Sequence, residues 1–302
     1  METNNSFDVI IIGGSFAGLS AAMALGRSLR KVLIIDSSKP CNIQTPHAHN
    51  FITHDGETPA SIAASALNQV LKYPTVSLKK GLAVKADKTE NGFEIGTETN
   101  ELFYSKKLIF ATGMKDIMPD IKGFGQCWGI SVLHCPYCHG YEVRNEETGI
   151  LANGEIAFEF AKMISHWTNK LTIYTNGKAL ITDEQVQKLQ AKGIAIVEDE
   201  IAELEHEGGY VNKMIFVNGK HTTIKVLYAK LEMIQHCDLP KTLGCKFTEM
   251  GFLEVDGFQQ TTVQGVYAAG DNTTMFRALP IAIASGTKAG ATLNKEMIYE
   301  EF

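Results

Sequence analysis

Two cysteines separated by two residues, Cys135 and Cys138, are the side chains of this sequence best suited to redox chemistry. Their spacing allows the two thiols to close a small disulfide ring and to open it again, and Cys-x-x-Cys motifs often have lowered thiol pKa values. A second motif, the glycine-rich run Ile12–Gly18, has the pattern of a dinucleotide-binding turn. Either motif alone is a weak signal. Together they predict disulfide chemistry coupled to a nucleotide cofactor.

The glycine-rich run fits the pattern G-x-G-x-x-G with one departure. Gly13 supplies the tight turn, and Gly18 lets the following helix pack against the strand. Ser15 stands where a glycine usually allows a pyrophosphate to approach, although its hydroxyl can itself donate to a phosphate. Asp36 ends the next apolar segment, where a carboxylate can accept hydrogen bonds from ribose hydroxyls. We therefore favour a nucleotide site over the alternative, a strand–helix turn without a ligand.

A second glycine turn is degenerate. Ala152 and Ala157 occupy the first and third glycine positions, and only Gly154 is kept. The run 174–177, after the next apolar segment, has neither the acidic residue typical of NAD sites nor an arginine for the NADP phosphate. The pattern predicts a retained fold whose NADPH site is weak or absent.

Zinc is the alternative ligand for the cysteine pair, but no second pair of ligands with zinc spacing accompanies it, so we predict no metal. His139 follows Cys138 directly and can exchange a proton with a thiolate, because its ordinary pKa is near neutrality. A capping or surface histidine is the alternative. His47, His49 and His54 form a further group, for which a loop beside the cofactor is favoured over a metal site. The four remaining cysteines are expected to be small buried side chains or incidental thiols.

Gly270 and Asp271 directly follow the apolar run 263–269 and place a carboxylate at the carboxyl end of a predicted strand. Ligands of open α/β sheets bind at this edge. The alternative role of Asp271 is a simple helix N-cap. Arg277 and a helix that starts near Pro280 add positive charge and backbone N–H groups for an anionic ring edge.

The composition limits the class of protein. A 302-residue chain is long enough for two domains, and 44% hydrophobic with 21% charged residues is typical of globular proteins. The net charge of −6 argues against nucleic acid and anionic membranes as partners. No apolar run reaches the roughly 20 residues of a membrane span, and the polar N-terminus lacks a signal-peptide pattern. We therefore expect a cytoplasmic protein.

Two βαβ patterns must position these motifs, one around each glycine turn. They predict an α/β fold with two Rossmann-like, three-layer dinucleotide-binding domains. The second domain, residues 117–244, is expected to be inserted in the first, residues 1–116 and 245–302. Linkers are expected at 116–125 and 240–244, and a helix over 282–294. Strands over 201–205, 211–217 and 222–228, joined by glycine turns, predict a small β-meander.

The motifs together resemble those of the low-molecular-weight thioredoxin reductases, a family of FAD/pyridine nucleotide-disulfide oxidoreductases. The resemblance covers nearly the whole chain. It rests on GGSFAG near the N-terminus, ATG at Ala111–Gly113, CPYC at Cys135–Cys138 and AAGD at Ala268–Asp271. The longer string HCPYCHGYE, residues 134–142, is similar to a branch of gliotoxin-type dithiol oxidases, which pass electrons from small dithiols through FAD to oxygen.

The resemblance implies an FAD-binding domain and a second domain that carries the redox pair, with Cys138 nearer the flavin and Cys135 facing the substrate. It implies a homodimer whose partner is a thioredoxin-like protein or a small-molecule dithiol or disulfide. His139 stands where the family has an acidic proton donor, so we expect it to act as the acid–base group. The candidate cofactor-binding residues are Gly13, Ser15, Gly18, Asp36, Asn50, Thr112, Gly113, Gly270, Asp271 and Arg277.

Three functions follow from these motifs. The first is an FAD-dependent thiol-disulfide oxidoreductase of thioredoxin reductase type, which shuttles electrons through the Cys135–Cys138 pair. The second is a dithiol oxidase, and the third is a flavin redox sensor that cycles its cysteines without turnover. The intact CPYC motif favours an enzyme, and the degenerate second glycine turn leaves the electron donor open.

Overall fold

The computed structural model describes residues 5–302. The chain forms two compact units. The first unit comprises Met1–Ile43, Ala60–Lys115 and Met233–Phe302, and the second comprises Gln44–Pro59 and Asp116–Glu232. The chain therefore returns to the first unit at Met233, twelve residues before the expected boundary at 245, and the segment Gln44–Pro59 packs with the second unit.

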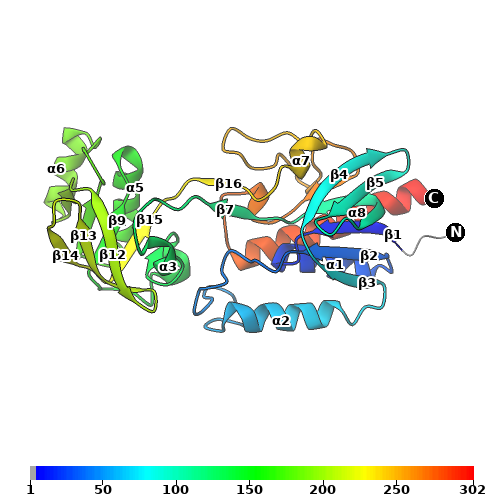
Figure 1. The fold of residues 1–302 in the computed structure, drawn as a ribbon, viewed down its shortest axis with the longest axis horizontal. Coiled ribbons are helices and arrows are strands. Elements are labelled where there is room, and N and C mark those ends of the chain that lie inside the picture. Colours follow the sequence, from blue (N-terminus) through cyan, green and yellow to red (C-terminus); the bar gives the residue numbers. More distant parts are fainter. Residues whose placement is uncertain (1–4) are drawn as a thin grey trace. The chain divides into compact units, whose positions relative to one another are not determined.

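A mixed sheet forms the centre of the first unit (Figure 1). Its strands run in the order β3-β2-β1-β6-β5-β4, and β17 pairs with the second half of β6. Strands β1, β2, β3, β6 and β17 are parallel, whereas β4 and β5 run antiparallel to their neighbours. The strands are β1 (Ser6–Ile12), β2 (Val32–Asp36), β3 (Val76–Lys80), β4 (Ala83–Thr89), β5 (Gly92–Thr97), β6 (Leu102–Phe110) and β17 (Val266–Ala268).

Helices cover one face of this sheet, where they form a buried core with alternate residues of the parallel strands. They are α1 (Phe16–Arg27), α2 (Pro59–Val70) and α8 (Leu279–Glu301). Gly286 lets α8 cross α1 closely, because a Cβ at this position would lie 2.0 Å from the carbonyl oxygen of Ala17. The helix expected over 282–294 is longer in the structure. Its last turns are anchored by the buried Lys107, whose Nζ lies 2.7 Å from Glu296 and 2.6 Å from Glu300.

The second unit has a parallel sheet in the order β11-β10-β9-β15-β8 and an antiparallel meander, β12-β13-β14. Its strands are β8 (Val132–Leu133), β9 (Thr148–Leu151), β10 (Leu171–Tyr174), β11 (Ala195–Val197), β12 (Ile201–Glu207), β13 (Tyr210–Phe216), β14 (His221–Thr223) and β15 (Val226–Ala229). Its helices are α3 (Phe124–Cys127), α4 (Pro136–His139), α5 (Gly154–Ile164) and α6 (Asp183–Ala191). The helix α6 begins with a capping box between Thr182 and Gln185.

The structure corrects the strand expected over 222–228. It divides into β14, which closes the meander, and β15, which enters the parallel sheet between β9 and β8. All four residues of β15 are buried, which is characteristic of a strand covered on both faces in a parallel sheet. The alternation of buried and exposed residues along the meander strands therefore ends before β15 begins.

The segments that join the units also differ from the expectation. The linker expected at 240–244 overlaps a short helix, α7 (Leu239–Thr242), whose Leu239 is buried in the first unit. Strands β7 (Met114–Asp116) and β16 (Met233–Gln235) pair with each other where the chain passes between the units. Within residues 5–302, no helix is both long and apolar enough to cross a membrane. The predicted α/β class, with two Rossmann-type units and a small meander, is confirmed.

Candidate active site

The carboxyl ends of three parallel strands meet at one edge of the first unit's sheet. There the N–H of Ala111 donates to Ile12, 2.8 Å away, and the N–H of Ala269 donates to Phe110, 3.0 Å away. The segments that follow β1, β6 and β17 therefore leave the sheet side by side. The structure thus brings together most of the predicted cofactor residues: Gly13, Ser15, Gly18, Thr112, Gly113, Gly270 and Asp271.

The first glycine turn leaves no room for larger side chains. Gly13 has φ of +105°, and a Cβ there would lie 2.2 Å from the carbonyl oxygen of Ala111. A Cβ on Gly18 would lie 1.9 Å from the carbonyl oxygen of Gly13. Ser15 is the N-cap of α1 but its side chain makes no capping hydrogen bond. The N–H groups of the first helical turn thus have no side-chain cap, which suits a pyrophosphate.

Asp36 closes the same edge from β2. Its Oδ1 accepts a hydrogen bond from the N–H of Gly14 at 2.8 Å, and its Oδ2 accepts one from the N–H of Ser38 at 3.0 Å. These contacts orient the carboxylate beside the glycine turn. Each carboxylate oxygen has a second lone pair, so the group can also accept from ribose hydroxyls.

The segment after β17 contains a residue that the sequence patterns did not reveal. Asn272, in the 3₁₀-helix η1 (Asp271–Thr273), is fully buried, and its Nδ2 donates to the carbonyl of Phe110 at 3.0 Å. Its Oδ1 has no hydrogen-bond partner within residues 5–302. Asp271 is held by Arg277, whose Nε lies 3.2 Å from its Oδ2, so this pair neutralises its own charges. The only available signal for Asn272 was its position after the GD pair.

The edge of the first unit fits FAD. The glycine cradle, the uncapped N-terminus of α1 and the ribose acceptor Asp36 suit the adenosine diphosphate portion. Gly113 has φ of +67°, and a Cβ built on it would meet nothing within 4 Å, so the backbone after β6 is open to a ligand. The unpartnered Oδ1 of Asn272 is an acceptor available to a bound group.

Cys135 and Cys138 lie in the second unit, at the two ends of one turn of backbone. Cys135 is the N-cap of α4, and the N–H of Cys138 donates to its carbonyl at 3.3 Å. Both residues are partly buried and stand as thiols. A hydrogen bond from the Cys138 side chain lowers the pKa of Cys135 to about 7, against the effect of burial and with help from the N–H groups of Cys138 and Tyr137. Cys135 is therefore partly ionised near neutral pH and can attack as a thiolate.

His139 follows the pair at the end of α4. Burial lowers the pKa of His139 below its ordinary value, the charge of His49 lowers it further, and Glu142 opposes both effects. His139 is thus neutral at pH 7, the state in which it can accept a proton. The Nδ1 of His49 lies 3.6 Å from Glu142 and 3.6 Å from Asp55. Sequence patterns placed His49 only in a loop, and its position beside this helix was not anticipated.

Asn50 belongs to the second unit, whereas the glycine turn belongs to the first. It lies in Gln44–Pro59, which packs with the second unit, and its N–H donates to Oδ1 of Asp55 at 2.7 Å. In the same segment the Nδ1 of His47 lies 2.9 Å from the carbonyl of Gly56, and that of His54 lies 2.9 Å from Glu57. Within the described chain no group of three or more His, Cys, Asp or Glu residues could hold a metal ion.

The remaining cysteines differ in exposure. Cys41 is exposed, Cys237 is partly buried, and Cys127 and Cys245 are buried. Burial raises the pKa of the Cys127, Cys237 and Cys245 thiols, which keeps them protonated and unreactive near neutral pH.

The second glycine turn is closed by the protein's own side chain. Asn153 is the N-cap of α5, and its Oδ1 accepts from the N–H groups of Gly154 and Leu180, each at 2.8 Å. Its Nδ2 donates to the carbonyl of Lys178 at 2.9 Å. The amide therefore occupies the position at the helix N-terminus where a pyrophosphate would bind in a Rossmann turn.

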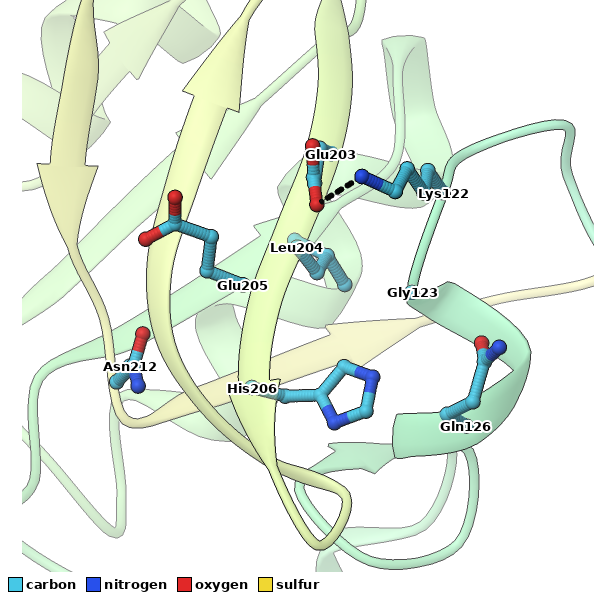
Figure 2. Close-up of a pocket in the computed structure, with 8 residues that line it drawn as sticks. All are labelled: Lys122, Gly123, Gln126, Glu203, Leu204, Glu205, His206 and Asn212. Atoms are coloured by element: carbon cyan, nitrogen blue, oxygen red, sulfur yellow. Dashed lines mark ion pairs between the residues drawn. The ribbon is translucent and has the colours of Figure 1, made fainter.

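A polar hollow of about 400 Å³ lies elsewhere in the second unit (Figure 2). It is lined by the ion pair of Lys122 and Glu203, 2.7 Å apart, and by His206 and Gln126. None of the residues around the cysteine pair lines it.

A dinucleotide-binding edge in one Rossmann-type unit and a dithiol with one acidified sulfur in another define a flavin-dependent disulfide oxidoreductase. The chain belongs to the pyridine nucleotide-disulphide oxidoreductase family, whose family model matches residues 7–286. It is a thioredoxin reductase-type flavoprotein, and its cofactor is FAD.

Similar proteins agree on this class. Thioredoxin reductase tcpT of Claviceps purpurea is 33% identical over 310 residues, which cover 99% of this chain and 96% of that protein. Thioredoxin reductase sirT of Leptosphaeria maculans is 30% identical over 307 residues, which cover 95% of this chain and 93% of that protein. The solved structure of a putative thioredoxin reductase TrxB from Bacillus anthracis has a TM-score of 0.94 at 30% identity, covering 98% of this chain and all of that one.

Proposed function

We propose that Cys135 and Cys138 are the redox pair of this oxidoreductase and that Cys135 is the sulfur that exchanges with the substrate. The low pKa of Cys135, caused chiefly by the Cys138 side chain, carries the proposal. About half of Cys135 is ionised at pH 7, which is close to the optimum for an attacking thiol.

Thiol–disulfide exchange between the cysteine pair and a substrate needs no further redox group in this unit. In the reductive direction the Cys135 thiolate attacks one sulfur of a substrate disulfide, which forms a mixed disulfide and releases the other substrate sulfur as a thiolate. Cys138 then loses its proton and attacks Cys135, which forms the Cys135–Cys138 disulfide and releases the second substrate thiolate. Two electrons have passed from the pair to the substrate. In the oxidative direction the same steps run in reverse, and a substrate dithiol reduces the pair. Bound FAD supplies or accepts the two electrons.

We propose that His139 moves the proton in these steps. It is neutral at pH 7 and sits next to Cys138 in the chain, so it can accept the proton that a thiol loses before attack. Glu142 and His49 then act on His139 through their charges.

Trapping the mixed disulfide tests the order of the two cysteines. A Cys138→Ser variant should form a stable adduct with an aromatic disulfide at Cys135, because no second thiol is present to release it. A Cys135→Ser variant should form little adduct at position 138. Mass spectrometry of the modified peptide gives the result, and a stable adduct in Cys135→Ser alone would reverse the assignment.

The second candidate function, dithiol oxidation, is favoured by the closed second glycine turn. Asn153 fills the anion position of α5, and Glu155 adds a carboxylate in its first turn. A nicotinamide dinucleotide would have to displace the amide and approach this charge, so we infer slow reduction of the flavin by NADPH. A small dithiol would then be the electron source and oxygen the acceptor.

Anaerobic mixing separates the two directions. The purified yellow protein is mixed with NADPH, NADH or a small dithiol while the flavin absorbance is followed. We expect bleaching by the dithiol and slow or no bleaching by either nicotinamide. Rapid bleaching by micromolar NADPH would contradict this expectation and assign the protein to disulfide reduction.

We further propose a thioredoxin-like protein or a small-molecule dithiol or disulfide as the partner, a homodimer as the assembly, and the cytoplasm as the compartment. The relatives' names, which are those of thioredoxin reductases, support the partner class. For FAD, we propose contacts from Gly13, Ser15, Gly18, Asp36, Thr112, Gly113, Gly270, Asp271 and Arg277.

A further inference from the structure

A buried tyrosine lies behind the cysteine pair in the second unit. Tyr228 belongs to β15 and is 1% exposed. It stands opposite Leu133 of β8 and Ile150 of β9. Its ring packs edge-on against Phe160 of α5, with centroids 5.9 Å apart. The ring is thus a central part of the core between the parallel sheet and its helices.

The hydroxyl of Tyr228 has no hydrogen-bond partner among the residues that the structure describes. Burying a hydroxyl without a partner costs on the order of 1–3 kcal/mol. Phenylalanine would fill the same space and avoid that cost. Since buried polar groups are nearly always paired, an orphaned phenol in an apolar core points to a partner that is formed only in another state of the protein.

The backbone leads from this tyrosine to the cysteines. Leu133, opposite Tyr228, shares its core cluster and therefore its side of the sheet. Cys135 follows two residues later in an extended conformation, with φ of −128° and ψ of 113°. Strand β8 ends at Leu133 and the chain bends at His134, so Cys135 begins α4 just beyond the end of the strand that pairs with Tyr228.

The charges agree with this placement. Burial raises the pKa of Tyr228, and negative charge on Cys135, Cys138 and Glu142 raises it further. The phenol consequently keeps its proton wherever the pair ionises, and it stays a hydrogen-bond donor.

We propose that Tyr228 donates a hydrogen bond from its buried hydroxyl to a thiolate of the Cys135–Cys138 pair when that thiolate forms during disulfide exchange. The donor stabilises the reduced, ionised pair, because a hydrogen bond to the charged form of an acid favours that form. It stays unpaired while the sulfurs are uncharged. This inference rests on the proposed redox role of the pair, and it makes the strand behind the motif part of the thiol site.

The test compares Tyr228→Phe with the unaltered protein. Fully reduced holoprotein is alkylated with iodoacetamide between pH 5 and 9, and modification of the Cys135 peptide is followed by mass spectrometry. We expect the apparent pKa of the pair to rise by about one unit, so the thiolate fraction at pH 6 falls about tenfold. Alkylation at pH 6 should slow by about threefold, since the more basic thiolate is intrinsically more reactive.

Two controls distinguish an effect of the hydroxyl on the cysteine pair from an effect on the stability of the fold. Tyr174→Phe removes another buried phenol from the same sheet, on its opposite face, and should leave the alkylation profile unchanged. The denaturation midpoint of Tyr228→Phe should not fall, because an unpaired group is removed and the ring remains. If Tyr228→Phe fails to fold, Tyr228→Met supplies a second variant without the hydroxyl.

An alkylation profile of Tyr228→Phe, or of Tyr228→Met in its place, that superimposes on that of the unaltered protein would overturn the inference. Failure of the proposed function would look different. In that case the unaltered pair would not form a disulfide when equilibrated with oxidised glutathione, whatever residue occupies position 228.

Discussion

Replacing Cys138 with alanine removes the largest contribution to the low pKa of Cys135, namely the hydrogen bond from the neighbouring side chain. Burial then dominates, and only the N–H groups at the start of α4 still favour the thiolate. We expect the pKa of Cys135 to rise from about 7 toward its ordinary value of 9.0. Serine at position 138 keeps a donor of similar length, so Cys138→Ser is the matched control and should keep the low pKa.

The size of the effect follows from ionisation and nucleophilicity together. If the whole shift is lost, the thiolate fraction of Cys135 at pH 7 falls from about one half to about one hundredth, on the order of fiftyfold. The more basic thiolate is about six to ten times more nucleophilic, because the Brønsted coefficient is about 0.4–0.5. Alkylation at pH 7 should therefore slow by about five- to eightfold. Above pH 9, where Cys135 is ionised in both proteins, the alanine variant should react faster than the unaltered protein.

Iodoacetamide alkylation of the peptide containing Cys135, measured from pH 5 to 10, gives both the pKa of Cys135 and the reactivity of its thiolate. The exposed Cys41 reacts as well, and following individual peptides by mass spectrometry separates it from Cys135. The two rate profiles should cross at about pH 8. Profiles that stay parallel, or a pKa near 7 in Cys138→Ala, would refute the assignment of Cys138 as the donor that acidifies Cys135.

Three further predictions concern the cofactor edge, the fold and the proton transfer. Asp36→Asn should weaken FAD binding by about 1–3 kcal/mol, measured by equilibrium dialysis, and unchanged affinity would remove Asp36 from the site. Gly286→Ala should lower the free energy of unfolding by about 1–3 kcal/mol, because its Cβ would meet the carbonyl of Ala17 at 2.0 Å; Gly257→Ala, which meets nothing within 4 Å, is the control. His139→Gln should slow turnover about 10²–10⁴-fold. Burial lowers the pKa of His139, so the unaltered enzyme should lose activity only below pH 6.5, where the base becomes protonated. In the His139→Gln variant the rate should no longer fall in this pH range. A variant with the rate and the pH dependence of the unaltered enzyme would assign the base to another group.

Much of the first unit follows from local pattern. An apolar strand, the Gly13 and Gly18 turn, a helix and a second strand ending at Asp36 occupy neighbouring stretches of chain, and short-range sterics determine such a βαβ unit. The Cys135–Cys138 spacing is local in the same way, because one turn of backbone joins the two thiols. The fold class, the flavin-dependent oxidoreductase and the family could therefore be predicted without coordinates.

The tertiary structure decided what depends on residues distant in the chain. Asn153 closes the second glycine turn only because the segment at Leu180 folds over the start of α5. His49 reaches Glu142 because Gln44–Pro59 packs with the second unit, which no periodicity could indicate. Tyr228 had the pattern of a meander strand, and its place behind the cysteines follows from the pairing of β15 with β8. Motifs specify which atoms can react, whereas long-range packing sets which other groups surround them, and that packing has no counterpart in any short stretch of sequence.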